Sequence, residues 1–259
     1  MPTWDPDQYL QFAEERTLPC RDLVKRIELN DPGRIIDLGC GPGNSTAVIS
    51  ERWPGARITG LDSSSEMIAA ARSSQPRNNW IVGDITAWAE ANDQAFELIF
   101  SNAAMQWVGD HSSVFARLMR HVASGGAFAA QMPGNFDASA HLLMRELAAS
   151  PAWRDRFPKG VREWHVHDLQ FYYDVLSPHA RRIDLWATEY IHVMPESGAI
   201  VEWYRGTGLR PFLNVLGTES DRDRFTSEYG QRLRTAYSQQ ADGRVLFPFR
   251  RLFMVAYRK

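Results

Sequence analysis

The sequence of 259 residues has little cysteine and no long apolar run. Its two cysteines, Cys20 and Cys40, are too few for a disulfide framework or a zinc site, so we expect reduced thiols and predict no metal. No apolar run approaches the length of a membrane span, and the first residues lack the charged and apolar regions of a signal peptide. These absences favour a cytoplasmic protein that has no membrane partner.

An excess of charge of either sign is also missing, since the formal net charge is −2 at pH 7. Without a general basic surface, nucleic acid is not expected as the main partner. The length is long for one domain and short for two, and we find no internal repeat. A single α/β domain over residues 1–259, with an embedded cap, is therefore predicted, and no obligate protein partner is implied.

What the sequence does contain is a glycine-rich turn, in the stretch from Arg34 to Asn44. A short β-branched apolar run breaks into Gly39, Gly41 and Gly43, and helical spacing resumes over residues 45–53. The order is strand, tight turn and helix. Glycine suits such a turn because the backbone angles are costly for other residues and because a ligand must approach the bare main chain. The first turn of the helix then offers free N–H groups to that ligand.

The spacing of the glycines argues against a dinucleotide. That fingerprint has glycine at its first, third and sixth positions, whereas here the sixth position is Asn44. Asp37, just before the turn, would repel a pyrophosphate but could receive a cationic amino group. The pattern therefore suits a nucleoside with a zwitterionic tail, while a glycine turn without any ligand stays open.

The ends of the later strands carry further candidates. Strands are predicted over residues 57–61, 80–82, 96–100 and 128–132. Asp62 follows the second strand about twenty residues after the glycines, where a carboxylate can accept hydrogen bonds from a ribose diol. Its alternative is a helix N-cap, which Ser63 or Ser64 could provide instead. Asn102 and Ala103 follow the fourth strand and should line the crevice at the carboxyl edge of the sheet.

The second half of the chain has a different rhythm. Helices are predicted over residues 6–16 and 19–29 at the start and over 138–149, 199–216 and 220–239 later, and an aromatic-rich, basic stretch fills 151–178. Strands over 181–193 and 247–257 would form an antiparallel edge. The fold class is thus α/β, a doubly wound, Rossmann-like, seven-stranded and mostly parallel sheet with an α-helical cap insertion. We assign residues 1–30 to a helical lid, 31–134 to a cofactor-binding half, and 135–178 with 195–240 to the cap.

The turn resembles the first motif of class I S-adenosylmethionine-dependent methyltransferases. Over essentially its whole length the chain is similar to the trans-aconitate 2-methyltransferase family. The resembling motifs are Trp-Asp-Pro with Tyr9, Asp37 to Thr46, Ile58 to Ser64, Gln131 to Pro133, Tyr172 to Asp174, Thr207 to Pro211 and Arg251 to Phe253. The motifs outside the cofactor half are the discriminating ones.

The resemblance implies S-adenosyl-L-methionine as cofactor, with S-adenosyl-L-homocysteine as product, and a small polycarboxylate as substrate. It places the N-terminal helix near the methionine end and Asp84 with Ile85 against adenine, where Asp84 could also be only the cap of a turn. The implied cofactor-binding residues are Tyr9, Phe12, Arg16, Asp37, Gly39, Gly41, Asp62, Ser63, Met67, Asp84, Ile85, Asn102, Ala103 and Trp107.

The expected chemistry needs no general base, because a carboxylate is already an ionised nucleophile at neutral pH. His111 is expected to be a surface or capping residue rather than a base. Orientation is assigned to Trp107, Tyr172 and Tyr173, and the substrate-binding candidates are Tyr172, Tyr173, Arg210, Arg251 and His165. The predicted activity is carboxyl O-methylation of trans-aconitate. Another small acid or acyl thioester, a non-catalytic S-adenosylmethionine-binding protein and an NAD-linked dehydrogenase are the alternatives.

Overall fold

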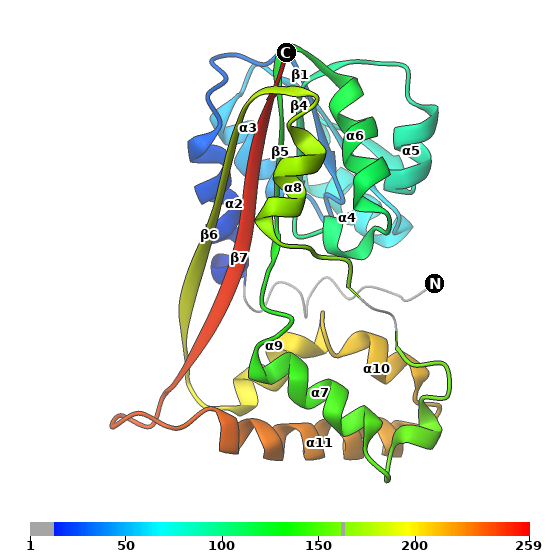
Figure 1. Cartoon of the computed structure of the whole chain (residues 1–259), viewed down its shortest axis with the longest axis vertical. Coiled ribbons are helices and arrows are strands. Elements are labelled where there is room, and N and C mark those ends of the chain that lie inside the picture. Colours follow the sequence, from blue (N-terminus) through cyan, green and yellow to red (C-terminus); the bar gives the residue numbers. More distant parts are fainter. Residues whose placement is uncertain (1–12, 162–163) are drawn as a thin grey trace. The chain divides into compact units, whose positions relative to one another are not determined.

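A computed structural model describes residues 13–161 and 164–259 of the chain (Figure 1). The chain forms two compact units. The sheet unit takes residues 13–133, 164–188 and 251–259, and the helical unit takes its described residues from 134–163 and 189–250. Among the described residues, no helix is both long and apolar enough to cross a membrane.

A seven-stranded sheet is the centre of the fold, with strand order β3-β2-β1-β4-β5-β7-β6. β1 lies between β2 and β4, and all pairings from β3 to β5 are parallel, whereas β7 runs antiparallel to β5. This arrangement confirms the predicted doubly wound sheet with an antiparallel edge. The strands are β1 (Arg34–Leu38), β2 (Arg57–Asp62), β3 (Asn79–Val82), β4 (Phe96–Asn102), β5 (Val122–Pro133), β6 (Ala180–Met194) and β7 (Val245–Arg258).

Helices cover both faces of this sheet (Figure 1). α2 and α3 pack together, and α6 packs with both α5 and α8. The helices of the sheet unit are α2 (Ala13–Arg26), α3 (Asn44–Arg52), α4 (Ser65–Ser74), α5 (Ile85–Ala91), the 3-10 turn η1 (Met105–Trp107), α6 (His111–His121) and α8 (Leu169–Leu176).

The alternation of side chains along the strands separates the two faces. Ile36 of β1, Phe128 of β5 and Met254 of β7 belong to one buried cluster with Phe115 of α6 and Leu176 of α8. On each strand, the residues that alternate with these, such as Asp37 after Ile36, point to the other face of the sheet. That second face carries the polar residues of the candidate site.

The predicted break between two N-terminal helices is wrong, because α2 continues through Pro19. A proline inside a helix removes one hydrogen bond and costs stability. Cys20, Leu23 and Val24 of α2 are buried and nearly inaccessible, and this packing keeps the segment helical. Residues 6–12 of the predicted first helix lie outside the described residues.

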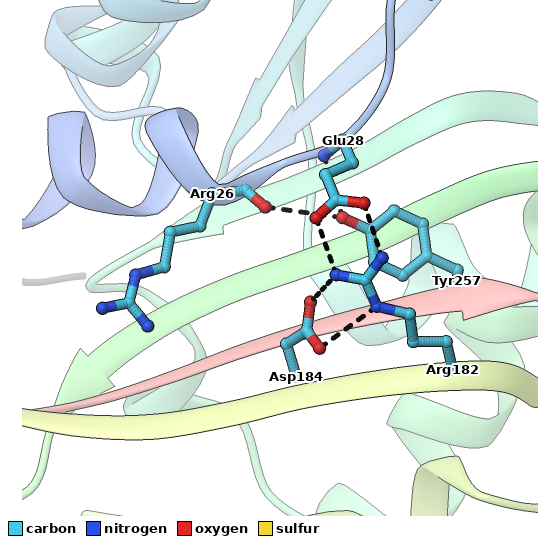
Figure 2. Close-up of polar contacts among 5 residues, drawn as sticks. All are labelled: Arg26, Glu28, Arg182, Asp184 and Tyr257. Carbon is cyan, nitrogen blue, oxygen red and sulfur yellow. Dashed lines mark hydrogen bonds and ion pairs between the residues drawn. The ribbon is translucent and has the colours of Figure 1, made fainter.

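The end of α2 is held to the edge of the sheet by a polar network, in which Glu28 and Arg182 are exposed and Tyr257 is buried (Figure 2). Arg182 of β6 donates to both carboxylate oxygens of Glu28, at 2.5 and 2.8 Å, and also to Asp184. The hydroxyl of Tyr257 accepts a hydrogen bond from the Glu28 backbone N–H and donates to the Arg26 carbonyl. Exposed ion pairs contribute little each, so this network fixes local geometry more than it adds stability.

The helical unit has its own aromatic core. Trp153 packs edge-on against Phe225, and its indole N–H donates to Glu228 at 2.8 Å. The predicted single helix over 199–216 is wrong, because the chain forms two helices there with a break over residues 206–209. The elements of this unit are α7 (Ser139–Ala149), the 3-10 turn η2 (Arg154–Arg156), α9 (Gly198–Arg205), α10 (Arg210–Val215) and α11 (Glu219–Ala236). Residues 164–178, predicted as part of the cap, belong instead to the sheet unit, where α8 contacts α6.

Candidate functional site

The glycine turn connects β1 to α3 as predicted. Gly39, Gly41 and Gly43 all have positive φ values, of 71°, 55° and 96°. The N–H groups of Gly39 and Cys40 donate to the Leu61 carbonyl, which ties the turn to the end of β2. The turn therefore has the left-handed backbone that favours glycine at each of the three positions.

Asp37 lies at the end of β1 and is completely buried. Its Oδ2 accepts hydrogen bonds from the hydroxyls of Ser45 at 2.6 Å and Thr46 at 2.7 Å, whereas its Oδ1 has no hydrogen-bond partner among the described residues. Burial raises the pKa of this carboxyl from 3.8 to about 6, although the two hydroxyls oppose the shift. A buried anion with one unpartnered oxygen is well suited to receive a cation.

Asp62, at the end of β2, braces the glycine turn. Its Oδ2 accepts from the Gly41 N–H at 2.9 Å and its Oδ1 from the Ser64 N–H at 2.9 Å. Burial raises the pKa of Asp62, while these backbone donors lower it. The N-cap of α4 is Ser64, whose hydroxyl accepts from the Met67 N–H. The capping role considered for Asp62 thus belongs to Ser64, and each Asp62 oxygen keeps a further lone pair.

The end of β4 completes this edge of the sheet. Ala103 has a φ of 55°, and its N–H donates to the Gln131 carbonyl at 2.8 Å. Asn102 is partly exposed, but its Oδ1 is buried and has no partner among the described residues. The structure thus brings together Asp37, Asn102 and the glycine turn at the carboxyl ends of adjacent strands.

Of the two residues predicted to contact adenine, Asp84 and Ile85, only Ile85 borders the glycine turn. Asp84 is exposed and caps α5 by accepting from the Ala87 N–H at 3.0 Å. Ile85 is buried, and its Cδ1 lies 3.7 Å from the position of a Cβ on Gly39. Met67 is buried and Ser63 is exposed. Ile85 therefore borders the glycine turn, and Asp84 has the capping role that the sequence left open.

Comparison with known proteins supplies the family. Residues 35–126 match the methyltransferase domain model. The chain is 49% identical to the trans-aconitate 2-methyltransferase of Azoarcus sp. and 45% identical to that of an Escherichia coli strain, with at least 99% of each protein covered. The chain belongs to the trans-aconitate 2-methyltransferase family. It is thus a class I methyltransferase that depends on S-adenosylmethionine, as the motifs predicted.

Solved structures agree on the fold. The protein YcgJ of Bacillus subtilis superposes with a TM-score of 0.59 at 16% identity, and covers 93% of this chain and 99% of its own. Phosphoethanolamine N-methyltransferase 2 of Haemonchus contortus, in complex with S-adenosyl-L-methionine, has a TM-score of 0.56 at 17% identity, over 97% of this chain and 57% of its own. At such identities the likeness concerns the fold alone.

Tyr172 and Tyr173, the tyrosines predicted to bind substrate, have different surroundings. Tyr173 is exposed, whereas Tyr172 is fully buried under α6. The Tyr172 hydroxyl lies 2.9 Å from Nδ1 of His111 and accepts from the His167 N–H at 3.1 Å. Because burial raises its pKa, Tyr172 stays neutral. Its hydroxyl is engaged in the core.

His111 is fixed by the same network. Its Nε2 lies 2.9 Å from the Met105 carbonyl, which can only accept, so Nε2 carries the proton and Nδ1 accepts from Tyr172. Burial lowers the pKa of His111, so the ring is neutral. Both ring nitrogens are bonded within the core. The expectation of a surface or capping histidine is therefore wrong, because His111 is buried and the N-cap of α6 is Asp110.

Trp107 and His165, which were predicted as cofactor-binding and substrate-binding residues, both lie at or beside η1. The His165 N–H donates to the Gln106 carbonyl at 2.9 Å, and the ring of Trp107 lies 6.1 Å from that of Trp164. His165 is exposed and Trp107 is partly buried. The structure thus places the segment with Trp164 and His165 beside η1, although the two are distant in sequence.

The remaining candidates are distributed between the units. Arg251 is buried on β7 of the sheet unit, and Arg210 is partly exposed at the start of α10 in the helical unit. Tyr9 and Phe12 lie outside the described residues. Arg16 lies in α2, but its side chain is outside the description as well.

Sequence reasoning did not single out Gln131, which was noted only within a motif. It is fully buried, and both its amide atoms lack a hydrogen-bond partner among the described residues. A polar residue inside an otherwise apolar strand such as Phe128 to Met132 was the available signal.

A surface depression of about 590 Å³ lies elsewhere on the sheet unit, between the end of α2 and β6. It contains none of the predicted site residues. Its lining is Lys25, Arg26, Glu28, Ile183, Asp184, Leu185 and Trp186. Among the residues that the structure describes, no group of three or more His, Cys, Asp or Glu side chains could hold a metal ion.

Proposed function

We propose that this protein transfers the methyl group of S-adenosyl-L-methionine to a carboxylate oxygen of trans-aconitate, giving the monomethyl ester and S-adenosyl-L-homocysteine. The observation that carries the proposal is the full-length relationship, at 49% identity, to a protein named trans-aconitate 2-methyltransferase. Bound S-adenosylmethionine would supply an electrophilic methyl group on a positively charged sulfur.

The reaction balances without proton transfer. A carboxylate oxygen forms a bond to the methyl carbon while the carbon–sulfur bond breaks, and its electron pair goes to sulfur. Both carboxylate and sulfonium charges are neutralised at the reacting atoms. The protein has to align the two groups and exclude water, and neither task needs an acid or a base.

The cofactor-facing roles follow from the edge formed by β1, β2 and β4. Asp62 would accept the ribose hydroxyls while it braces Gly41. The unpartnered Oδ1 atoms of Asp37 and Asn102 would accept from the ammonium group. Ile85 would contact the adenine ring. Asp37, Asp62 and Asn102 fit the cofactor because they offer acceptors to its donors, and Ile85 fits because it offers an apolar surface to the ring.

The substrate-facing roles require cations. Arg251 is the buried cation at the end of the β5–β7 pair, and Arg210 is the second candidate. Arginine suits a carboxylate because its planar fork can donate two parallel hydrogen bonds. His165, Trp107 and Tyr173 would line the wall next to η1, and Tyr172 would hold that wall in place from the core.

The test is incubation of the purified protein with methyl-labelled S-adenosylmethionine and a panel of organic acids. We expect label to appear in a base-labile ester of trans-aconitate, with other acids and acyl thioesters competing weakly. Turnover of a different acid in preference would leave the methyltransferase class intact but reassign the substrate. Cofactor binding without transfer to any acid would contradict catalysis altogether.

A further inference from the structure

Gln131 on β5 has a polar side chain in the buried interior of the protein, where an unpaired polar group lowers stability. It is 0% exposed, and neither its Oε1 nor its Nε2 has a hydrogen-bond partner among the described residues. A buried amide without partners destabilises the fold, because its hydrogen bonds to water are lost and not replaced. Since both amide atoms lack partners, exchanging Oε1 and Nε2 would not remove the cost.

Strand register places Gln131 on the face of the sheet that carries Asp37. Gln131 is opposite Asn102 on β4, and Asp37 is opposite Phe100, two residues earlier on the same strand. Residues two apart on a strand share a face. Asp37, Asn102 and Gln131 therefore lie on one face, at the carboxyl ends of three adjacent strands. Met132, the next residue on β5, belongs to the apolar cluster on the opposite face.

The unpartnered atoms on this face define a ligand chemistry. Asp37 Oδ1, Asn102 Oδ1 and Gln131 Oε1 are three acceptors, and Gln131 Nε2 is a donor. A polycarboxylate at neutral pH offers only acceptors, so it could satisfy Nε2 alone and would face the anionic Asp37. An α-amino acid end offers an ammonium group with three N–H donors beside a carboxylate. Its ammonium matches the three acceptors, and its carboxylate matches Nε2.

We propose that the side chain of Gln131 binds the amino-acid end of the cofactor, accepting from its ammonium group through Oε1 and donating to its carboxylate through Nε2. This inference rests on the S-adenosylmethionine dependence in the proposed function. It adds to the glycine turn and Asp62 a recognition residue from β5. Gln131 would distinguish the complete cofactor from adenosine thioethers that lack an amino acid.

The test compares two ligands on the full chain by calorimetry. S-adenosylhomocysteine carries the amino-acid end, and 5′-methylthioadenosine carries the adenosine and sulfur without it. For Gln131→Met and Gln131→Leu we expect the Kd of S-adenosylhomocysteine to rise roughly tenfold or more, and that of methylthioadenosine to stay within about twofold. Met132→Leu is the matched control, because it changes the neighbouring residue on the other face and should leave both constants unchanged.

Thermal unfolding without ligand separates recognition from a structural role. Replacing an unsatisfied buried amide by an apolar side chain of similar size should leave the melting temperature unchanged or raise it. A lower melting temperature with an unchanged Kd for S-adenosylhomocysteine would overturn the proposal, as would failure of both variants to fold. A raised KM for the acid at saturating cofactor, with no change in cofactor binding, would reassign Gln131 to the substrate. If the parent protein bound neither nucleoside, the proposed function itself would fail.

Discussion

A Cβ atom added to Gly39 would lie 2.1 Å from the Cβ of Ala104. The turn after β1 and the turn after β4 thus approach each other so closely that no side chain fits between them. Gly39 also has a φ of 71°, which is costly for other residues. The close approach of these two turns therefore requires glycine at position 39.

Gly39→Ala should therefore lower the free energy of unfolding by about 2 kcal/mol or more, from backbone strain and overpacking together. Denaturant unfolding monitored by circular dichroism measures the change. Gly41→Ala is the matched control, because Gly41 also has a positive φ, of 55°, but nothing lies within 4 Å of its added Cβ. It should cost less stability than Gly39→Ala, and equal losses would mean that the Ala104 contact relaxes freely.

Asp62→Ala should weaken binding of S-adenosylhomocysteine roughly tenfold or more, since it removes a charged acceptor and releases the Gly41 N–H. Isothermal titration calorimetry gives the Kd directly. Asp84→Ala serves as the comparison, because the exposed Asp84 carboxylate caps α5. If its role is capping alone, Asp84→Ala should lower stability and change the Kd less. Unchanged binding in Asp62→Ala would show that the ribose is recognised elsewhere.

Arg210→Ala should raise the KM for the acid roughly tenfold, because one charged hydrogen-bond donor to a carboxylate is lost. The Kd of the cofactor should not change. Arg205→Ala on the preceding helix is the control, because Arg205 pairs locally with Glu202 at 3.1 Å. Initial-rate kinetics at saturating S-adenosylmethionine measure the effect, and equal KM values in both variants would remove Arg210 from the substrate site.

The sequence predicted the strand ends well and the partners of side chains poorly. Asp37 and Asp62 were predicted from their sequence positions next to strand ends, and the structure places them at the ends of β1 and β2. Tyr172 and Tyr173 are adjacent and chemically alike, yet only Tyr172 is buried, because α8 turns that one residue toward α6. Such a choice depends on the rotation of a helix, which a short motif does not determine.

Gln131 illustrates a second limit. Gln131 lies opposite Asn102 because β4 pairs with β5, and its amide atoms have no hydrogen-bond partner among the described residues. Neither fact can be predicted from the spacing of residues within one strand. Pro19 illustrates a third, since its local preference predicts a helix boundary. The buried face of α2 outweighs that preference.

Asp37 should make the stability of the ligand-free protein depend on pH. Because burial raises its pKa from 3.8 to about 6 in the folded state, the folded protein binds more protons than the unfolded chain between these values. Its contribution therefore destabilises the fold as pH rises through this window, by about 3 kcal/mol at most. Asp37→Asn cannot ionise, so the difference in unfolding free energy, variant minus parent, should grow between pH 4 and 6 by an amount of this order.

The same substitution should weaken cofactor binding, because it removes the charge that receives the ammonium group. Denaturant unfolding at several pH values measures the stability difference, and calorimetry at pH 7 measures the Kd. Ser45→Ala provides the control, since it removes a hydroxyl that holds Asp37 Oδ2 at 2.6 Å and lowers the pKa. It should move the pH dependence of the parent to higher pH without abolishing it. A stability difference between Asp37→Asn and the parent that is independent of pH would mean that Asp37 ionises near its ordinary pKa, and the case for a carboxylate desolvated at the end of β1 would fail.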